Sequence, residues 1–214
     1  MQNDGEPAGD RLNRLLVEAG LAPLPSNASL RFAQYLELLL RWNARLNLTA
    51  IRDRDEILSR HFAESIACAR LLPDGISSLL DFGSGAGIPG IPIALIRGEI
   101  AVTLAESQGK KAAFLREVVR TLGLSAKVHG ARAEELQLRF DCVTLRAVDR
   151  MAVAVATAGS LVAVNGWLAV MTTHAEAGVI LAAAGLAFRW RERIALQGGG
   201  DARILLLGER LSGQ

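Results

Sequence analysis

One stretch, SSLLDFGSGAGIPG at positions 77–90, constrains the fold more than any other part of the chain. A short apolar run comes first, and glycines then stand at 83, 85, 87 and 90. An apolar run that ends at turn-forming residues predicts a buried strand, and the apolar residues after the glycines predict a helix. This order is typical of open α/β sheets, which bind ligands beyond the carboxyl ends of their strands.

The same alternation continues toward the C-terminus. Further strands are predicted at 101–106, 126–130, 140–147 and 167–173, and helices at 91–97, 107–122 and 152–159. Near the end, 188–196 and 203–208 flank the turn sequence GGGDA and predict a hairpin. We therefore expect an α/β fold with a mostly parallel, Rossmann-like sheet that ends in an antiparallel hairpin. By analogy, class I S-adenosylmethionine-dependent methyltransferases are built in this way.

Residues 10–72 carry no strand pattern and predict three helices. Asp10 can cap the first, and leucines at helical spacing between 30 and 46 mark the second. The third begins at Asp53, which has an acidic residue three positions later as in a capping box, and it stops before Pro73. We divide the chain into two parts, a helical segment at 1–74 and the α/β domain at 75–214.

Composition excludes several kinds of protein. The 24 basic and 22 acidic residues give a net charge of +2, too small for a polybasic tail but compatible with local basic patches. Cys68 and Cys142 lack the spacing of a zinc site or a disulfide framework, so we expect no metal. The N-terminus lacks the pattern of a secretory signal, and polar residues interrupt the apolar tract at 151–171, so we expect a cytoplasmic protein without a membrane span.

The glycine loop fits two cofactors. Residues 85–90 satisfy the G-x-G-x-x-G pattern of a dinucleotide site, while 81–87 satisfy D-x-G-x-G-x-G, the pattern expected for S-adenosylmethionine. Asp81 beside the loop and Pro89, which lacks an N–H, disfavour a pyrophosphate. The sulfonium and ammonium groups of S-adenosylmethionine make a carboxylate at the strand end favourable, directly or through water. Glu106 ends the next strand and can accept hydrogen bonds from the ribose hydroxyls of either cofactor.

Three other interpretations stay open at this point. The glycines can simply form a tight turn, the chain can be a nicotinamide-dependent oxidoreductase, or it can be a non-catalytic RNA-binding protein on a methyltransferase fold. An acidic residue at the end of the second strand argues against the first, and Asp81 and Pro89 argue against the second. The complete D-x-G-x-G-x-G pattern, together with Glu106, argues against the third.

Six phrases follow one another over most of the chain: RWNARLNLTAI (41–51), SRHFAESI (59–66), LDFGSGAGIPGIPIAL (80–95), LAESQGKKAAFLREV (104–118), HGARAEEL (129–136) and FDCVTLRAV (140–148). In order and spacing they resemble the bacterial ribosomal RNA small subunit methyltransferase G family, also called glucose-inhibited division protein B. The resemblance implies transfer of a methyl group from S-adenosylmethionine to N7 of one guanine in the 530 loop of 16S rRNA.

By position, the resemblance also implies cofactor contacts. The glycine loop contributes Gly83 and Ile88, and the end of the second strand contributes Glu106 and Ser107. Ala133 and Glu134 lie beside the adenine, and Arg146 comes from the end of the fourth strand. The motif residues Asp81, Gly85 and Gly87 complete the predicted cofactor site. Two positions depart from the family pattern. Glu64 stands where the family usually has Asp, which keeps the charge. Thr173-His174 stands where it has Lys-Gly, which puts in doubt any substrate contact of that loop.

Guanine N7 has an in-plane lone pair and no proton to lose, so its methylation needs no general base and we assign none. The protein must align N7, the methyl group and the sulfur, and Arg146 and His61 are candidates for that positioning. Because N7 faces the deep, narrow groove of an RNA helix, a loop guanine or a flipped one is the expected substrate.

The resemblance makes the helical segment 1–74 a candidate for RNA contacts. Basic side chains around such a pocket are the individual candidates, namely Arg60, His61, Lys110, Lys111 and Arg132. His61 fits a core or capping role equally well. Tyr35 and Trp42 are expected in the core of the helical segment. We expect a monomer that acts on 16S rRNA or on the small ribosomal subunit.

Overall fold

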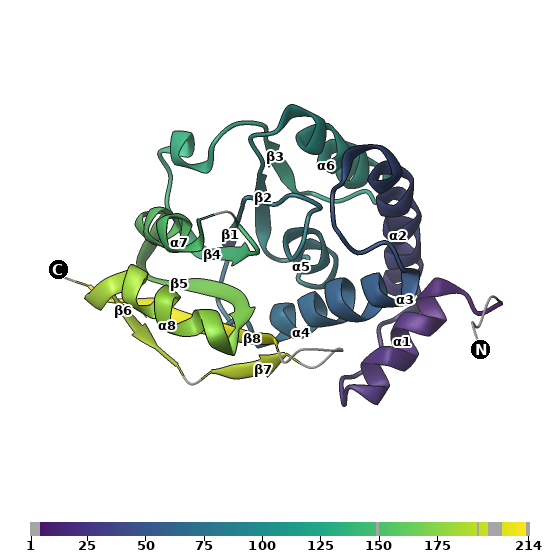
Figure 1. Cartoon of the computed structure of the whole chain (residues 1–214), viewed down its shortest axis with the longest axis horizontal. Helices are drawn as coiled ribbons and strands as arrows, with labels where there is room; N and C mark the ends of the chain where they lie inside the picture. The colour runs from purple at the N-terminus through teal and green to yellow at the C-terminus, as the bar shows by residue number, and fades with distance from the viewer. Residues whose placement is uncertain (1–4, 149, 192, 197–202, 213–214) are drawn as a thin grey trace.

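A computed structural model of the protein describes residues 5–148, 150–191, 193–196 and 203–212. Its sheet has the strand order β3-β2-β1-β4-β5-β8-β6, and β7 also pairs with β8 (Figure 1). The strands are β1 Ser78–Phe82, β2 Ala101–Ala105, β3 Lys127–His129, β4 Phe140–Arg146, β5 Val162–Thr173, β6 Phe188–Trp190, β7 Ile194–Leu196 and β8 Arg203–Arg210. β1 to β5 pair in parallel, and β8 is antiparallel to its three neighbours, so the predicted fold class is confirmed.

Helices connect the parallel strands. After β1 come α5 Gly90–Ile96, then α6 Gly109–Thr121 after β2, the short 3₁₀ helix η2 Ala133–Leu136 after β3, and α7 Met151–Ser160 after β4. α8 His174–Ala184 and η3 Gly185–Ala187 follow β5. The sequence analysis did not predict α8 as a separate helix. The side chain of Thr173 caps it by accepting the N–H of Glu176, so the Thr173-His174 pair is a helix start in this chain.

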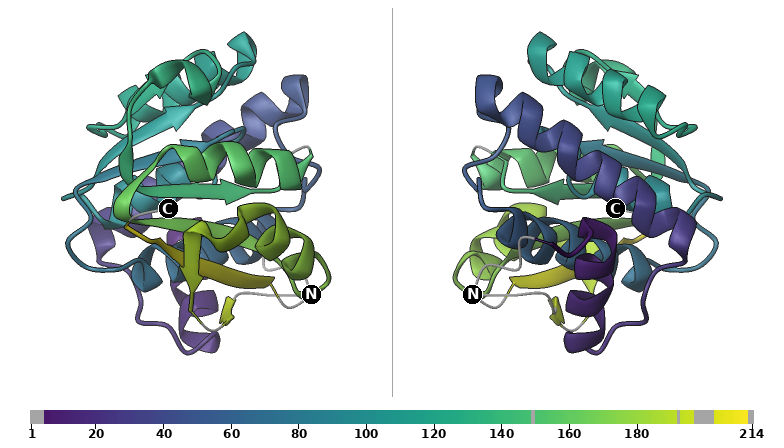
Figure 2. Two further views of the ribbon diagram at one scale, coloured as in Figure 1. Left: turned by 90° about the vertical axis from the view of Figure 1, so that its left-hand side faces the viewer. Right: turned by 90° about the vertical axis from the view of Figure 1, so that its right-hand side faces the viewer.

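The two faces of the sheet bury two different sets of helices. Neighbouring strand residues point to opposite faces. Leu79 belongs to the core cluster that contains residues of α1 (Ala8–Glu18), α2 (Ser26–Leu46), α4 (Glu64–Leu71), α5 and α6, and Leu80 belongs to the cluster that contains residues of α7 and α8. Figure 2 shows α7 and α8 in front of the sheet from one side, and α1 and α2 in front from the other. Apolar residues at alternate strand positions therefore form the core on both faces.

The N-terminal helices share the core of one sheet face. They are α1 Ala8–Glu18, α2 Ser26–Leu46, α3 Arg54–Glu56, the π-helical turn η1 Ile57–Ala63 and α4 Glu64–Leu71. The prediction that Asp10 caps the first helix is wrong: α1 begins after Pro7, and Asp10 lies in its first turn, where a negative charge suits the helix dipole. The prediction for Asp53 is confirmed, because its Oδ1 accepts the N–H of Glu56 at 2.9 Å.

The end of the chain forms the predicted antiparallel pair, since β7 and β8 pair from Ile194 with Leu205 to Leu196 with Arg203. The expected turn GGGDA lies outside the described residues. β6 adds an edge strand beside β8, where Trp190 lies opposite Gly208. Among the described residues, no helix combines the length and the apolarity that crossing a bilayer requires.

Candidate functional site

The glycine loop joins β1 to α5 at the carboxyl edge of the sheet. Gly83, Gly85 and Gly87 have φ angles of +70°, +54° and +84°, a region that residues with a Cβ rarely adopt. At Gly87 a Cβ would also lie 3.0 Å from the hydroxyl of Tyr35. The backbone therefore requires all three glycines of the D-x-G-x-G-x-G pattern.

Asp81 lies behind this loop and not in front of it. Its carboxylate is buried, with 1% of the residue exposed, and it accepts the hydroxyl of Thr144 at 2.9 Å and the N–H of Gly90 at 3.2 Å. Burial raises the pKa of Asp81 to about 6, although its hydrogen bonds act in the opposite direction. We expected a carboxylate facing a ligand, whereas the structure uses it to hold the loop and the start of α5.

Glu106 connects two loops at the same edge. Its Oε2 accepts the N–H of Gly85 at 2.9 Å and its Oε1 accepts the N–H of Gln108 at 2.7 Å. An ionised carboxylate has about four acceptor positions, so both oxygens keep capacity for hydroxyl donors. Ser107, the next residue, is exposed beside it. The structure thus places the predicted ribose acceptor directly against the glycine loop.

Parallel pairing aligns the other predicted cofactor residues along this edge. Phe82 at the end of β1 pairs with Ala105 of β2 and with Leu145 of β4, and Ala105 pairs in turn with His129 of β3. The segments that follow β1, β2 and β3 carry Gly83, Glu106, Ala133 and Glu134, and Arg146 is the last residue of β4. Ala133 is buried at the start of η2, and Glu134 is exposed.

Arg146 at the end of β4 is the centre of a buried polar group that we call the arginine cluster, made of Thr49, His61, Glu64 and Arg146. The two N–H groups of Nη2 of Arg146 are shared among three acceptors: Oε2 of Glu64 at 2.9 Å, the carbonyl oxygen of Arg60 at 2.7 Å and Nδ1 of His61 at 3.3 Å. The side chains of Arg146 and Glu64 are only 6% and 1% exposed. Its Nη1 is buried and has no hydrogen-bond partner among the described residues.

Burial sets the protonation of the arginine cluster. It lowers the pKa of His61 to about 3, with the charge of Arg146 acting in the same direction, so the imidazole is neutral at pH 7. Because Nδ1 accepts from Arg146, the proton sits on Nε2, which donates to Oγ1 of Thr49 at 2.7 Å. Burial also raises the pKa of Glu64 and lowers that of Arg146, and each charge offsets part of this cost for the other.

The basic candidates for RNA contacts differ in exposure. Lys110 is exposed and Lys111 half-buried in the first turn of α6, and Arg132 is exposed just before η2. Arg60 and His61 are both half-buried, and the ring of His61 lies between Thr49 and Arg146. The structure therefore places Lys110 and Arg132 after β2 and β3 at the surface and makes His61 part of the arginine cluster.

Sequence reasoning missed several residues that shape this site. Tyr35 is in the core as expected, yet its hydroxyl also donates to the carbonyl oxygen of Ala86 in the glycine loop. Thr144 bonds to Asp81, and Thr49 and Glu64 complete the arginine cluster. Thr49 and Glu64 lie within the family phrases at 41–51 and 59–66, but nothing in their spacing shows that they meet.

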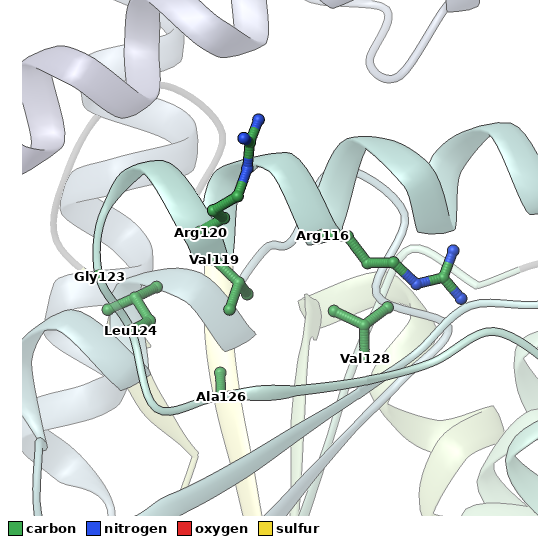
Figure 3. Close-up of a pocket in the computed structure, with 7 residues that line it drawn as sticks. All are labelled: Arg116, Val119, Arg120, Gly123, Leu124, Ala126 and Val128. Carbon is green, nitrogen blue, oxygen red and sulfur yellow. The ribbon is translucent and has the colours of Figure 1, made fainter.

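A separate hollow lies beside the outer strand β3. It has a volume of about 420 Å³ and lies between α6 and the segment that leads into β3 (Figure 3). Figure 3 shows Arg116 and Arg120 extending from α6 above an apolar floor formed by Val119, Leu124, Ala126 and Val128. None of these residues belongs to the glycine loop or the arginine cluster, so this hollow is not part of the candidate site.

Comparisons with known proteins show which family the chain belongs to. The family model of rRNA small subunit methyltransferase G matches residues 29–185. The ribosomal RNA small subunit methyltransferase G of Stenotrophomonas maltophilia is 46% identical over 160 residues, which cover 72% of this chain and 74% of that protein. The protein of that name from a Roseiflexus species is 47% identical over 129 residues, 57% of this chain and 55% of its own.

Solved structures resemble the fold at lower identity. A predicted O-methyltransferase of Agrobacterium tumefaciens has a TM-score of 0.58 at 21% identity and covers 69% of this chain and 80% of its own. A SAM-dependent methyltransferase from Aquifex aeolicus has a TM-score of 0.57 at 16% identity, with coverages of 73% and 93%. At these identities the likeness concerns the fold alone.

Proposed function

The chain belongs to the rRNA small subunit methyltransferase G family, and from this premise we propose that it transfers a methyl group from S-adenosylmethionine to N7 of one guanine in the 530 loop of 16S rRNA. The observation that carries the proposal is the hydrogen bond between Glu106 and Gly85. It joins an acceptor for ribose hydroxyls to a loop of glycines in left-handed conformations, at the ligand-binding edge of the sheet.

The residues present fit the methyl donor. Gly83 has no side chain at an exposed position of the loop, and Glu106 retains acceptor capacity beside it. We propose that Gly83, Gly85, Gly87 and Ile88 hold the donor's amino-acid part, that Glu106 and Ser107 hold the ribose, and that Ala133 and Glu134 border the adenine. Asp81 acts indirectly, because it fixes Gly90 from behind. The donor, when bound, supplies an electrophilic methyl group.

The chemistry requires alignment and no proton transfer, because N7 attacks with a lone pair and the product is a cationic purine. A neutral His61 suits this, because its lowered pKa makes it a poor general base near pH 7, and Glu64 is held in an ion pair with Arg146. We propose that Arg146 acts as a positioning residue. By binding the carbonyl oxygen of Arg60, it ties η1 to the end of β4, so that the N-terminal helices border the substrate.

Four basic side chains that are exposed or half-buried suit an RNA substrate. We propose that Arg60, Lys110, Lys111 and Arg132 contact rRNA phosphates around the site, and that the helical segment 1–74 contributes to this surface. Family membership supports action on small-subunit rRNA. We propose that the enzyme is a monomer that acts in the cytoplasm on 16S rRNA or on the small ribosomal subunit.

Calorimetry and a transfer assay test this function. Purified protein is expected to bind S-adenosylmethionine and to transfer its labelled methyl group to 16S rRNA, while a fluorescence titration with NADH gives no binding. Binding of rRNA without turnover would instead identify a non-catalytic RNA-binding protein. Failure to bind S-adenosylmethionine at all would refute the proposal.

A further inference from the structure

Tyr35 connects the N-terminal helices to the glycine loop. It lies in the middle of α2, is completely buried, and is the only tyrosine of the chain. Its ring stacks on Phe62 of η1, with ring centroids 4.8 Å apart and planes 13° from parallel. Its hydroxyl donates a hydrogen bond to the carbonyl oxygen of Ala86, 51 residues further along the chain. One side chain therefore joins α2, η1 and the loop after β1.

The hydroxyl can act only as a neutral donor or acceptor. Burial raises the pKa of Tyr35 well above its ordinary value, and the charge of Asp81 acts in the same direction. The phenol therefore keeps its proton at neutral pH. Ala86 is itself buried, so its carbonyl oxygen has a strong need for a donor.

Tyr35 supplies one of three side-chain anchors of the loop. Glu106 holds the N–H of Gly85 and Asp81 holds the N–H of Gly90, while Tyr35 holds the carbonyl oxygen between them. Glycines flank Ala86 on both sides, and glycine restricts its own backbone least of all residues. The conformation of this part of the loop therefore depends on anchors that come from other elements.

We propose that Tyr35 is a positioning residue for the methyl donor: its hydroxyl keeps the loop at Ala86 in the conformation that binds S-adenosylmethionine. The proposal rests on the proposed function for the identity of the ligand. When only a fraction of the protein holds the binding conformation, the apparent dissociation constant rises by the inverse of that fraction. Because Tyr35 lies on α2, its buried hydrogen bond makes the affinity for the donor depend on the position of that helix.

The substitution Tyr35→Phe tests this directly, because it keeps the ring and its stacking on Phe62 and removes only the hydroxyl. We expect the dissociation constant for S-adenosylmethionine to rise about tenfold, the order expected for one lost buried hydrogen bond. The KM for rRNA and the kcat at saturating donor should stay at the wild-type values. In the free protein, amide hydrogen exchange of a peptide covering 83–89 should become faster.

Phe140→Leu is the matched control. Phe140 is buried at the start of β4, at the opposite edge of the sheet from the loop, so its truncation lowers stability without touching the donor site. The control should lower Tm while donor affinity and exchange of 83–89 stay at the wild-type values.

The two readouts separate the possible failures. Wild-type exchange and wild-type donor affinity in Tyr35→Phe would overturn the role of Tyr35, as would an equal loss of affinity in Phe140→Leu. If the wild-type protein bound no S-adenosylmethionine, the proposed function would fail, and with it the donor-positioning role. Exchange at 83–89 would still show whether Tyr35 holds the loop.

Discussion

The glycine loop and the arginine cluster are neighbours, since they follow the paired strands β1 and β4, but different forces hold them. In the loop, side chains from surrounding elements bind backbone groups, as Glu106 does with Gly85 and Asp81 with Gly90. In the cluster, one buried charge pair, Arg146 with Glu64, organises neutral partners. The comparison teaches that loop geometry depends on small residues, whereas the cluster depends on charge balance.

Removing the positive charge of Arg146 should give the largest loss of stability and of methyl transfer. Arg146→Ala leaves Glu64 buried without its partner, so we expect the free energy of unfolding to fall by about 3–5 kcal/mol and methyl transfer to be lost. Urea unfolding measures the first and a labelled-methyl assay the second. Arg54→Ala is the control, because its ion pair with Glu37 is exposed on both sides and its loss should cost less than about 1 kcal/mol. Equal losses in the two variants would contradict the assignment of a buried charge pair.

Adding a single methyl group at Gly90 should distort the end of the glycine loop. In Gly90→Ala the new Cβ would lie 2.6 Å from Oδ2 of Asp81, so we expect a destabilisation of about 1–3 kcal/mol and a weaker affinity for S-adenosylmethionine. Gly98→Ala is the matched control, since no heavy atom lies within 4 Å of the added methyl group. Urea unfolding of both variants measures the loss of stability, and calorimetry measures their affinity for S-adenosylmethionine. A Gly90→Ala protein that behaves like Gly98→Ala would show that the loop tolerates side chains.

The two regions should respond to pH with opposite signs. The pKa of Asp81 is raised from 3.8 to about 6, so the folded protein binds its proton more tightly than the unfolded chain does. The stability that this group contributes is complete below pH 3.8 and is lost as pH rises through 6, with a slope of up to about 1.4 kcal/mol per pH unit. The pKa of His61 is lowered from 6.5 to about 3, so its contribution is complete above pH 6.5 and is lost as pH falls toward 3.

Difference curves isolate these contributions. The free energy of unfolding of the wild type minus that of Asp81→Asn should fall between pH 4 and 6. The same difference for His61→Gln should rise with pH over that window. Urea unfolding at half-unit pH steps measures both. If both differences changed with pH in the same direction, the two regions would not respond to pH in opposite ways, and the prediction would be contradicted.

The smallest effect should come from the outer edge of the arginine cluster. Thr49→Val removes an oxygen that interacts with Nε2 of His61 and accepts the N–H of Ile51, and we expect a loss of about 1 kcal/mol. Affinity for S-adenosylmethionine should not change, because no hydrogen bond of the glycine loop involves Thr49. Thermal unfolding and calorimetry check the two parts, and a weaker donor affinity would show that the two regions are coupled.

The same contrast explains what could be predicted from the sequence. The strand, loop and helix around Asp81 form one contiguous pattern, so the sequence predicts their order and the need for glycines. It also predicts the capping role of Asp53. The direction of the Asp81 carboxylate was not, because it depends on Thr144 from another strand. In the arginine cluster, His61 and Arg146 are 85 positions apart, and only packing decides that His61 turns toward Arg146.

Mapping of N7-methylguanine tests the central claim most directly. Borohydride and aniline treatment cleaves rRNA at this modified base, so 16S rRNA from cells with and without this gene can be compared. We predict cleavage at one guanine of the 530 loop that disappears without the gene and returns with the wild-type gene but not with the Arg146→Ala variant. Cleavage at that guanine that persists without the gene would contradict the proposed function.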